Sequence, residues 1–369
     1  MEGEGVDVRA RAEKAAKRRT AKGKKTSNSL YIALGIFGGF MALVVGFMVL
    51  NPELPPNKIP ALDASLIESA NGAGLGYTQQ ANEHFKDWTL ADVATASNSF
   101  ISQAAKHVNP CDTYSAEGEL VPSSYDVRED FPDCLEPVVF MGNCSAGYAL
   151  ATASVLSERF CIQSNGDIKV SLSPQDILSC DPKSDGCIGG NIDTVWNNIR
   201  DMGLVEESCF PYKSPNMTPA NCTTDKPSTC KTYKATKICA TVTEQGIMRE
   251  IKKHGPVVAA MVIYTDFLAY HAGIYRPQKT STKIQGAHAV EILGWGTDKD
   301  SQEQYWVIKN SWGEDWGEDG YARVLRGIRE LGLEDYVVTG TPWLQEEEAK
   351  PHVEQVEEPV ETENLDKSS

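Results

Sequence analysis

A cysteine placed just before an apolar helix is the first feature of this sequence that could do chemistry. The stretch MGNCSAGYAL, residues 141–150, contains Cys144 and continues in small and apolar residues to Cys161. A thiolate is stabilised at a helix N-terminus by the positive end of the dipole and by a nearby imidazole. A structural disulfide is the simpler interpretation of Cys144 alone. The residue that then needs explaining is Gly147, which has no side chain.

Helical segments come first in the chain and β-rich segments second. The central helix is expected from near Ser145 to near Cys161, ending before the turn residues 164–166. Ser173 and Pro174 provide a cap and a first-turn proline for a second helix, and Asp193–Met202 has helical spacing. Short β-rich runs follow, punctuated by glycine: 257–262, 289–293 and 305–308. This order predicts an α+β fold with two lobes.

The net charge of −16 is distributed unevenly along the 369 residues. Residues 1–29 contain nine Lys or Arg and four Asp or Glu, whereas Leu344–Ser369 contains nine acids and two lysines. The basic residues are concentrated in one short tail beside a hydrophobic stretch, which disfavours a nucleic-acid-binding role. The acidic tail is expected to be disordered.

The hydrophobic stretch Leu30–Leu50 has 21 residues without a charge, about the length of a bilayer core. Its basic flank lies on the N-terminal side, so the positive-inside rule places residues 1–29 in the cytosol. A cleaved signal peptide is the alternative, but it would have a shorter basic region and a small-residue cleavage site. Here NPELPP follows at residues 51–56. The sequence therefore predicts one uncleaved membrane span, N-in, as in a type II protein.

All ten cysteines, from Cys111 to Cys239, lie beyond this stretch. Outside the cytosol such a distribution indicates a disulfide framework. Three Asn-x-Ser/Thr sequons, at Asn143, Asn216 and Asn221, agree with a secretory or endolysosomal lumen or with the cell exterior. Because Asn143 adjoins Cys144, we expect it to be too buried for glycosylation.

Several longer motifs together resemble the papain family of cysteine peptidases, with most similarity to cathepsin B, over Ala61–Pro342. They are LVPSSYDVREDFPDC (120–134), SLSPQDILSC (171–180), DGCIGG (185–190), GAHAV (286–290) and KNSWGEDWG (309–317). The resemblance implies a two-lobed fold with a helical left lobe and a β-barrel-like right lobe. It also implies that residues 61–118 correspond to a propeptide and residues 119–342 to the papain-like domain.

The resemblance assigns roles to the following residues in this sequence. His288 matches the catalytic base, Asn310 the group that orients its imidazole, and Trp312 the ring that shields the pair from water. Gly189 and Gly190 match the backbone that binds the substrate chain. A histidine among apolar residues is usually a satisfied core group, and glycine pairs usually make turns, but the two specific motifs favour catalytic ancestry.

The departures from the family pattern decide the expected function. The nucleophile position falls on Gly147, directly before the aromatic Tyr148, and the oxyanion-hole glutamine falls on Met141. The acid of the cathepsin B specificity pocket appears as Tyr336. Shifting the alignment to make Cys144 the nucleophile would misplace Tyr148. It would also take Cys144 from the disulfide partner that the resemblance gives it, Cys187.

The resemblance implies the disulfides Cys134–Cys161 and Cys144–Cys187. It leaves the connectivity open for Cys180, Cys209, Cys222, Cys230 and Cys239, with Cys111 in the propeptide-like part. The loop 213–230 has no His-His pair like that of cathepsin B's occluding loop, so dipeptide-trimming activity is not implied. A metal site on His288 finds no second ligand at suitable spacing, and no metal or cofactor is expected.

We therefore predict a membrane-anchored, catalytically inactive peptidase homologue that binds or scaffolds proteins whose identity the sequence does not give. An active cysteine-type endopeptidase with its nucleophile elsewhere is the alternative. The expected organisation has six parts. They are a basic cytosolic tail (1–29), a transmembrane helix (30–50), a stalk (51–60), the propeptide-like segment (61–118), the papain-like domain (119–342) and an acidic disordered tail (343–369).

Overall fold

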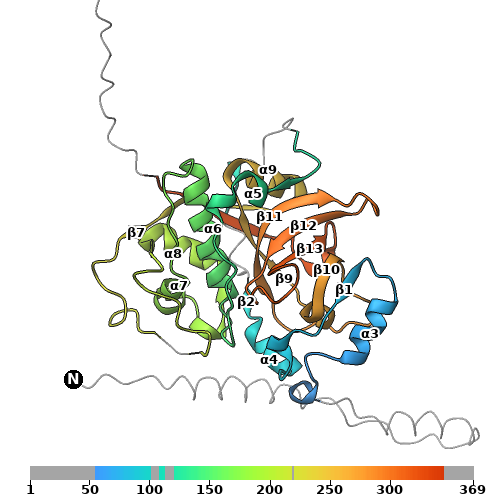
Figure 1. The fold of residues 1–369 in the computed structure, drawn as a ribbon. Coiled ribbons are helices and arrows are strands. Elements are labelled where there is room, and N and C mark those ends of the chain that lie inside the picture. The colour runs from blue at the N-terminus through green and yellow to red at the C-terminus, as the bar shows by residue number, and fades with distance from the viewer. Residues whose placement is uncertain (1–54, 101–107, 113–119, 218–219, 345–369) are drawn as a thin grey trace, which may run out of the picture. The chain divides into compact units, whose positions relative to one another are not determined.

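The computed structural model describes residues 55–100, 108–112, 120–217 and 220–344 (Figure 1). Contacts within the chain divide it into two units, Met1–Glu53 and Leu54–Ser369, and all described residues belong to the second. The predicted basic tail, residues 1–29, and the acidic tail from residue 345 onward lie outside the described residues.

The central helix, α6, covers Gly147–Gln163 and is buried along nearly its whole length. It packs against β11 and β14 on one side and against α7 and α8 on the other (Figure 1). The helix is present as predicted, but it begins two residues after Ser145. The Ser145 hydroxyl accepts a hydrogen bond from the Asn98 N–H, 47 positions away in the chain, instead of capping the helix.

Two shorter helices complete the helical lobe. Helix α7 (Pro174–Cys180) begins where the sequence predicted, with the Ser173 hydroxyl accepting the Asp176 N–H at 3.0 Å. Helix α8 (Ile192–Met202) buries its apolar stripe of Val195, Trp196 and Ile199. These residues recur at helical spacing, so that one face of α8 supplies the core of this lobe.

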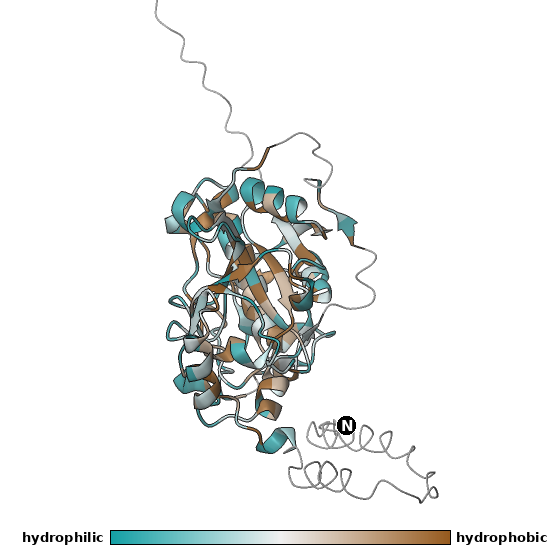
Figure 2. Cartoon of the chain, turned by 90° about the vertical axis from the view of Figure 1, so that its right-hand side faces the viewer, coloured by the Kyte–Doolittle hydropathy of each residue, from teal (hydrophilic) through white to brown (hydrophobic). Residues whose placement is uncertain are grey.

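The second lobe is built on a ten-stranded sheet in the order β1-β10-β13-β12-β11-β9-β14-β8-β3, with β4 paired to β11. Its longer strands are β8 (Ala235–Thr241), β9 (Val257–Met261), β10 (Tyr270–Tyr275), β11 (His288–Thr297), β12 (Gln304–Lys309), β13 (Tyr321–Leu325) and β14 (Val337–Pro342). Helix α9 (Glu244–His254) packs on β9 and β11. Hydrophobic residues gather on the central strands, as Figure 2 shows. The three predicted β-rich runs coincide with β9, β11 and β12, and the α+β prediction is confirmed.

The propeptide-like segment contains both helices and short strands. Its elements are α3 (Ala64–Gly72), β1 (Tyr77–Gln79), the 3₁₀ turn η2 (Glu83–Phe85), α4 (Leu90–Ala96), β2 (Ser99–Phe100) and β3 (Asn109–Pro110). Helix α4 starts with a capping box between Thr89 and Asp92. All three short strands pair with the papain-like part, β1 with β10, β2 with β5 and β3 with β8.

Short elements connect these parts. They are η1 (Pro56–Lys58), β4 (Tyr125–Asp126), α5 (Val127–Asp130), η5 (Pro132–Cys134), η6 (Gly186–Ile188), β5 (Gly190–Asn191), β6 (Leu204–Val205), β7 (Thr232–Tyr233), η7 (Thr265–Ala269) and η8 (Arg329–Leu331). Residues 55–60, the described part of the expected stalk, pack against the propeptide-like segment. The Ile59 carbonyl accepts the Leu90 N–H at 2.9 Å, and Pro60 forms a bridge with Thr89.

Five disulfides pair all ten cysteines. Cys134–Cys161 and Cys144–Cys187 are the two pairs that the family resemblance implied. The structure also settles the connectivity that the sequence left open: Cys180–Cys222, Cys209–Cys230 and Cys111–Cys239.

The prediction of a membrane-spanning helix requires correction. Within the described ranges, no helix is both long and apolar enough to cross a bilayer. The 17-residue α6 would extend about 25 Å, short of a core of about 30 Å, and it is buried in protein. The stretch predicted to span the membrane, residues 30–50, lies outside the described residues.

Candidate active site

His288 and Asn310 lie side by side because β11 and β12 are antiparallel neighbours. His288 opens β11 and Asn310 directly follows β12, with His288 Nε2 2.8 Å from Asn310 Oδ1. Oδ1 also accepts the Ser311 N–H at 2.8 Å, which fixes the orientation of the amide. Because Oδ1 can only accept, the contact places the imidazole proton on Nε2. Nδ1 is then left as an acceptor.

The Nδ1 atom of His288 is buried and has no hydrogen-bond partner in the structure. It faces Gly147, the first residue of α6. A Cβ atom added to Gly147 would lie 3.1 Å from Nδ1, 3.0 Å from Cε1 and 3.3 Å from the Ala289 carbonyl oxygen. Position 147 is therefore where a side chain would meet the imidazole. Contacts this short mean that His288 would have to move by a few tenths of an ångström to admit one.

Burial also sets the protonation state of His288. The loss of hydration lowers the pKa of its imidazole to about 4, although the hydrogen bond that Nε2–H donates to Asn310 Oδ1 opposes this shift. The imidazole is consequently neutral near pH 7.

Trp312 covers this pair on one side. Its ring centroid lies 4.9 Å from that of His288 and 5.0 Å from that of Phe85 in the propeptide-like segment. Trp312 is only 2% exposed, and the stacked rings cover this side of the imidazole. The shielding role that the sequence suggested for Trp312 is compatible with this geometry and remains a prediction.

Met141, the residue that the family resemblance assigns to the oxyanion position, has a buried side chain. Its backbone N–H donates to the Ser311 carbonyl at 2.8 Å, and its own carbonyl accepts from the Tyr212 hydroxyl at 2.8 Å. The Ser311 hydroxyl approaches its sulfur at 3.6 Å. The thioether has no N–H or O–H, so it cannot donate to a developing oxyanion.

Gly189 and Gly190 are approached too closely for any side chain. Gly189 has φ +131°, and a Cβ there would lie 2.1 Å from the Asn98 carbonyl oxygen. A Cβ on Gly190 would lie 2.5 Å from the Tyr148 ring. The two residues present backbone to the propeptide-like segment, and Ser99 of β2 pairs with Gly190 in parallel register.

A stretch of the propeptide-like segment runs between the two lobes at this point, and we call residues 97–99 the strap. On the side opposite Gly190, the Ser99 N–H donates to the Ala287 carbonyl at 2.8 Å. A Cβ on Gly286 would lie 1.9 Å from the Ser97 carbonyl oxygen. The strap thus fills the cleft next to His288 with the chain's own backbone.

Tyr336 is half-buried just before β14. Burial and the nearby charge of Asp193, a residue of α8, raise the pKa of its phenol to about 12. A phenol with this pKa is uncharged at neutral pH, so Tyr336 supplies no anionic group to a specificity pocket.

The sequence reading missed a buried ion cluster that lies beside Asn310. Lys309 Nζ lies 2.8 Å from Glu158 and 3.8 Å from Glu291, and all three side chains are nearly inaccessible. Burial and the charge of Glu158 raise the pKa of Glu291 well above its usual value. The signal was present in the sequence, because Glu291 interrupts the apolar run 289–293.

Metal ligation is not supported by the described residues. Two groups of possible ligands come within reach of one another, Cys111/Cys239/Glu250 and Asp176/Cys180/Cys222. Each group contains a disulfide, whose sulfurs cannot provide the thiolates that bind metal ions.

Comparisons with known proteins agree on one family. The family model described as "Papain family cysteine protease" matches residues 121–341. The chain is 37% identical to "Cathepsin B-like CP3" of Giardia intestinalis over 225 residues, which is 59% of this chain and 74% of that protein. It is 33% identical to human "Tubulointerstitial nephritis antigen" over 313 residues, 74% of this chain and 64% of that protein.

A solved structure gives the same result. The fold superposes on "proCathepsin B S9 from Trypanosoma congolense" with a TM-score of 0.70 and 28% identity, covering 77% of this chain and all of that one. The match extends beyond the region covered by the family model, and the solved protein is named as a proenzyme.

Proposed function

The chain belongs to the papain family of cysteine proteases, and from this premise we propose that it is a catalytically inactive member that binds or scaffolds other proteins. One observation carries the proposal: Gly147 stands where the nucleophile would meet His288, and the imidazole Nδ1 facing it is buried without a partner. The base and its orienting amide remain, but they have no thiol to act on.

The state of the cysteines argues against a nucleophile elsewhere in the chain. None of the ten is free, and Cys144, the cysteine nearest in sequence to Gly147, is bonded to Cys187. A disulfide sulfur carries no thiolate and cannot attack a peptide carbonyl. The alternative of an active endopeptidase would therefore need a disulfide to open first.

The size of the expected loss supports inactivity. Removing the nucleophile of a catalytic triad lowers turnover by about 10⁶-fold, and removing one oxyanion donor lowers it by about 10²–10³-fold. The two effects are not additive, but the loss at Gly147 is sufficient by itself. In addition, Met141 cannot donate a hydrogen bond to the developing oxyanion, and a nucleophile supplied from elsewhere would still need that hydrogen bond.

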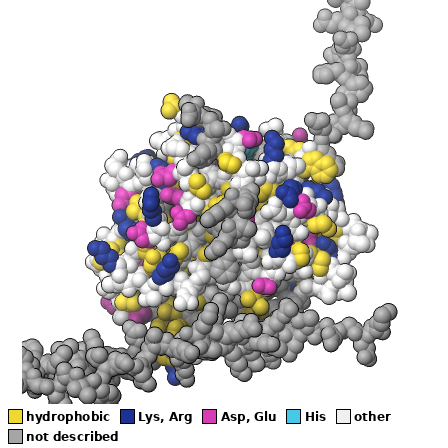
Figure 3. All heavy atoms as spheres, turned by 180° about the vertical axis from the view of Figure 1, so that it is seen from behind, with side chains coloured by type: hydrophobic (Ala, Val, Ile, Leu, Met, Phe, Trp, Pro, Cys, Tyr) yellow, Lys and Arg dark blue, Asp and Glu magenta, His cyan; other side chains and the backbone are white. Residues whose placement is uncertain are grey.

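The partner surface is proposed to lie outside the old cleft, because the strap already occupies it. Acidic and basic side chains are interspersed with scattered hydrophobic ones on the rear face in Figure 3. Among the matched relatives, some are named as an antigen and others as cathepsin B-like proteins. Not every matched relative is therefore named for peptidase activity.

Disulfides and sequons support a secretory or endolysosomal lumen or the cell exterior as the place where the papain-like domain, residues 119–342, works. Asn143, Asn216 and Asn221 are all exposed, so each is open to glycosylation. The expectation that Asn143 is too buried was wrong. Its backbone N–H donates to the Pro215 carbonyl at 2.7 Å while the residue remains at the surface.

Peptide hydrolysis tests the proposed function. The purified protein is assayed on a mixed peptide library against the His288→Ala variant, both with its five disulfides intact and after mild reduction. We expect no cleavage above the buffer background for either protein. Turnover by the parent that His288→Ala abolishes would contradict the proposal and favour the active endopeptidase.

A further inference from the structure

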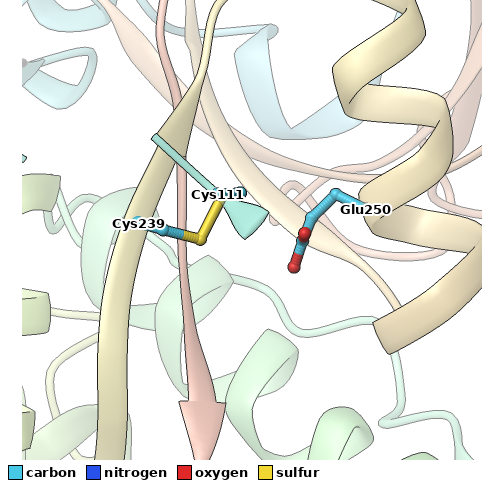
Figure 4. A group of neighbouring side chains, drawn as sticks. All are labelled: Cys111, Cys239 and Glu250. Atoms are coloured by element: carbon cyan, nitrogen blue, oxygen red, sulfur yellow. A yellow bond between two sulfur atoms is a disulfide. The ribbon is translucent and has the colours of Figure 1, made fainter. Parts of the chain in front are cut away.

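We propose that the Cys111–Cys239 disulfide locks the cleft-filling segment onto the papain-like domain, so that cutting the backbone after Cys111 does not open the cleft. Figure 4 shows this bond joining the end of the propeptide-like segment to β8, with Glu250 of α9 beside it. The bond links residues 128 positions apart. It closes a covalent loop that contains the boundary between the segment and the domain.

The disulfide is built into the sheet edge. Strand β3 pairs in parallel with β8, with Asn109 opposite Cys239, and the Cys111 N–H donates to the Ala240 carbonyl at 3.1 Å. The two Cα atoms of the cysteines are 4.7 Å apart, within the normal range for a disulfide. The pairing therefore places both cysteines for bonding without a local rearrangement.

Only part of the bond is accessible to solvent. Cys111 is 2% exposed and Cys239 is half-buried, so a thiolate has access mainly from the side of Cys239. The Glu250 side chain is buried next to the bond, held by Arg159 at 3.1 Å. The backbone just after the segment is much more accessible, because Leu120 is 95% exposed.

The order of features along the chain explains why the bond matters. The strap, residues 97–99, lies upstream of Cys111, whereas the exposed Leu120 lies downstream. Further upstream, the Tyr77 hydroxyl donates to Asp266 at 3.0 Å, and β1 pairs with β10. The strap is thus anchored on both sides. A cut at Leu120 removes neither anchor.

A covalent tether changes the occupancy of the cleft by mass action. A tethered segment is present at the cleft at an effective concentration on the order of 1 mM. A released fragment that has been diluted is present at only about 10 nM. The tether therefore gives the segment an advantage of about 10⁵-fold in rebinding. Access to the cleft requires both a backbone cut and reduction of the bond by a dithiol, which becomes oxidised to its own disulfide as two thiols form.

This inference concerns access to the cleft and does not depend on whether the cleft is catalytically inactive. The test inserts a recognition sequence for a site-specific protease between Leu120 and Val121 of the full chain. The protein is immobilised by its C-terminal end, cut, and washed at about 10 nM without reductant. Mass spectrometry then measures the fraction of the N-terminal fragment that remains.

The parent is expected to retain essentially all of the fragment and to run as one species on a denaturing non-reducing gel. Reduction should separate it into two species. The Cys111→Ser/Cys239→Ser variant should lose at least tenfold more fragment during the wash. The matched control Cys209→Ser/Cys230→Ser removes a disulfide within the domain and should retain the fragment like the parent.

Two results would overturn the proposal. One is release of the fragment from the cut, unreduced parent. The other is equal retention by the Cys111→Ser/Cys239→Ser variant, which would show that noncovalent contacts suffice. If that variant does not fold, the non-reducing gel of the cut parent decides alone, because two species before reduction contradict the lock.

Discussion

The burial of His288 distinguishes this imidazole from one that holds a thiolate in place. Nε2 is engaged with Asn310 while Nδ1 faces the hydrogen atoms of Gly147. Burying the neutral imidazole with Nδ1 lacking a hydrogen bond costs free energy, and favourable packing around the ring must offset that cost. The stack with Trp312 supplies that packing.

The first prediction concerns pH. Folded His288 has a pKa of about 4, whereas an unfolded histidine has a pKa near 6.5. Between these values the unfolded chain binds more protons, so the free energy of unfolding must fall as the pH is lowered from 6.5 toward 4. From pH 7 to pH 5 this histidine should account for about 2 kcal/mol of lost stability.

Denaturant titrations at pH 7 and pH 5 measure this loss. Between these two pH values the free energy of unfolding of the His288→Gln variant should fall by about 2 kcal/mol less than that of the parent. Gln keeps an N–H that can donate to Asn310 but does not titrate. The exposed His271→Gln is the matched control and should follow the parent. An unchanged pH profile for His288→Gln would mean that His288 binds protons equally in the folded and unfolded chains, which contradicts the lowered pKa.

The second prediction restores the missing groups one at a time. In a cut chain carrying Cys111→Ser/Cys239→Ser, Gly147→Cys should create a thiol that alkylates faster than a free cysteine at pH 7, because it sits at the α6 N-terminus beside an imidazole. Peptide hydrolysis should still be about 10²–10³-fold below that of Gly147→Cys/Met141→Gln.

Gly147→Ala adds the same Cβ without a thiol and serves as the control for both rates. Equal hydrolysis by the single and the double variant would show that Met141 does not occupy the oxyanion position. Failure of both variants to alkylate would show that position 147 does not face His288.

Residue types and spacing were enough to bring His288, Asn310, Trp312 and Gly147 into one candidate site. The contacts of the site were not predictable in the same way. The exposure of Asn143 depends on a loop that is pinned by Pro215, and the ion cluster around Lys309 depends on which side chains meet across α6 and β11. Local sequence does not contain such long-range packing.

At the scale of elements, the strap owes its position to anchors on both sides of the cleft. Upstream of it, Phe85 is 1% exposed and packs edge to face on Trp312. The helices α3 and α4 of this segment are held by local capping at Asp63 and Thr89. The short strands β1, β2 and β3 were missed because each exists only through its partner strand in the domain.

The third prediction uses that contact. Phe85→Ala should weaken docking of the segment by about 3–5 kcal/mol, the usual cost of removing a buried phenyl ring. Hydrogen exchange of the Val93 amide, which is bonded to the Thr89 carbonyl in α4, should accelerate accordingly. Leu66→Ala alters a side chain that is 57% exposed on the same segment and should change the exchange rate little.

Unchanged protection at Val93 in Phe85→Ala would show that the segment does not need the Trp312 contact. The segment would then be held by its strands and by the disulfide alone.

At the scale of the whole molecule, five disulfides hold the described unit together. Cys134–Cys161 and Cys144–Cys187 followed from the family resemblance, whereas Cys111–Cys239 could not be predicted, because the partner of Cys111 is decided by the pairing of β3 with β8. The two-lobed order of helices and strands was predictable. The proposed membrane span was not supported by any helix in the part of the chain that the structure describes.

The fourth prediction is that full reduction lowers the melting temperature by more than about 10 °C. Each disulfide typically contributes about 2–4 kcal/mol, and 1 kcal/mol corresponds to about 2–4 °C for a domain of this size. Calorimetry with and without reductant measures the change. An alkylating reagent without reductant is the control and should have no effect, because no cysteine is free. A melting temperature insensitive to reductant would contradict the disulfide framework.

The central claim, that the cleft contains no nucleophilic thiol, is tested most directly by intact-mass measurement after treatment with a thiol-directed, mechanism-based peptidase inhibitor. The protein is cut at Leu120 in the Cys111→Ser/Cys239→Ser background, so that the strap cannot protect the cleft. The account predicts no added mass for the protein that keeps Gly147 and one adduct for the Gly147→Cys variant. A stoichiometric adduct on Cys144 without Gly147→Cys would contradict it.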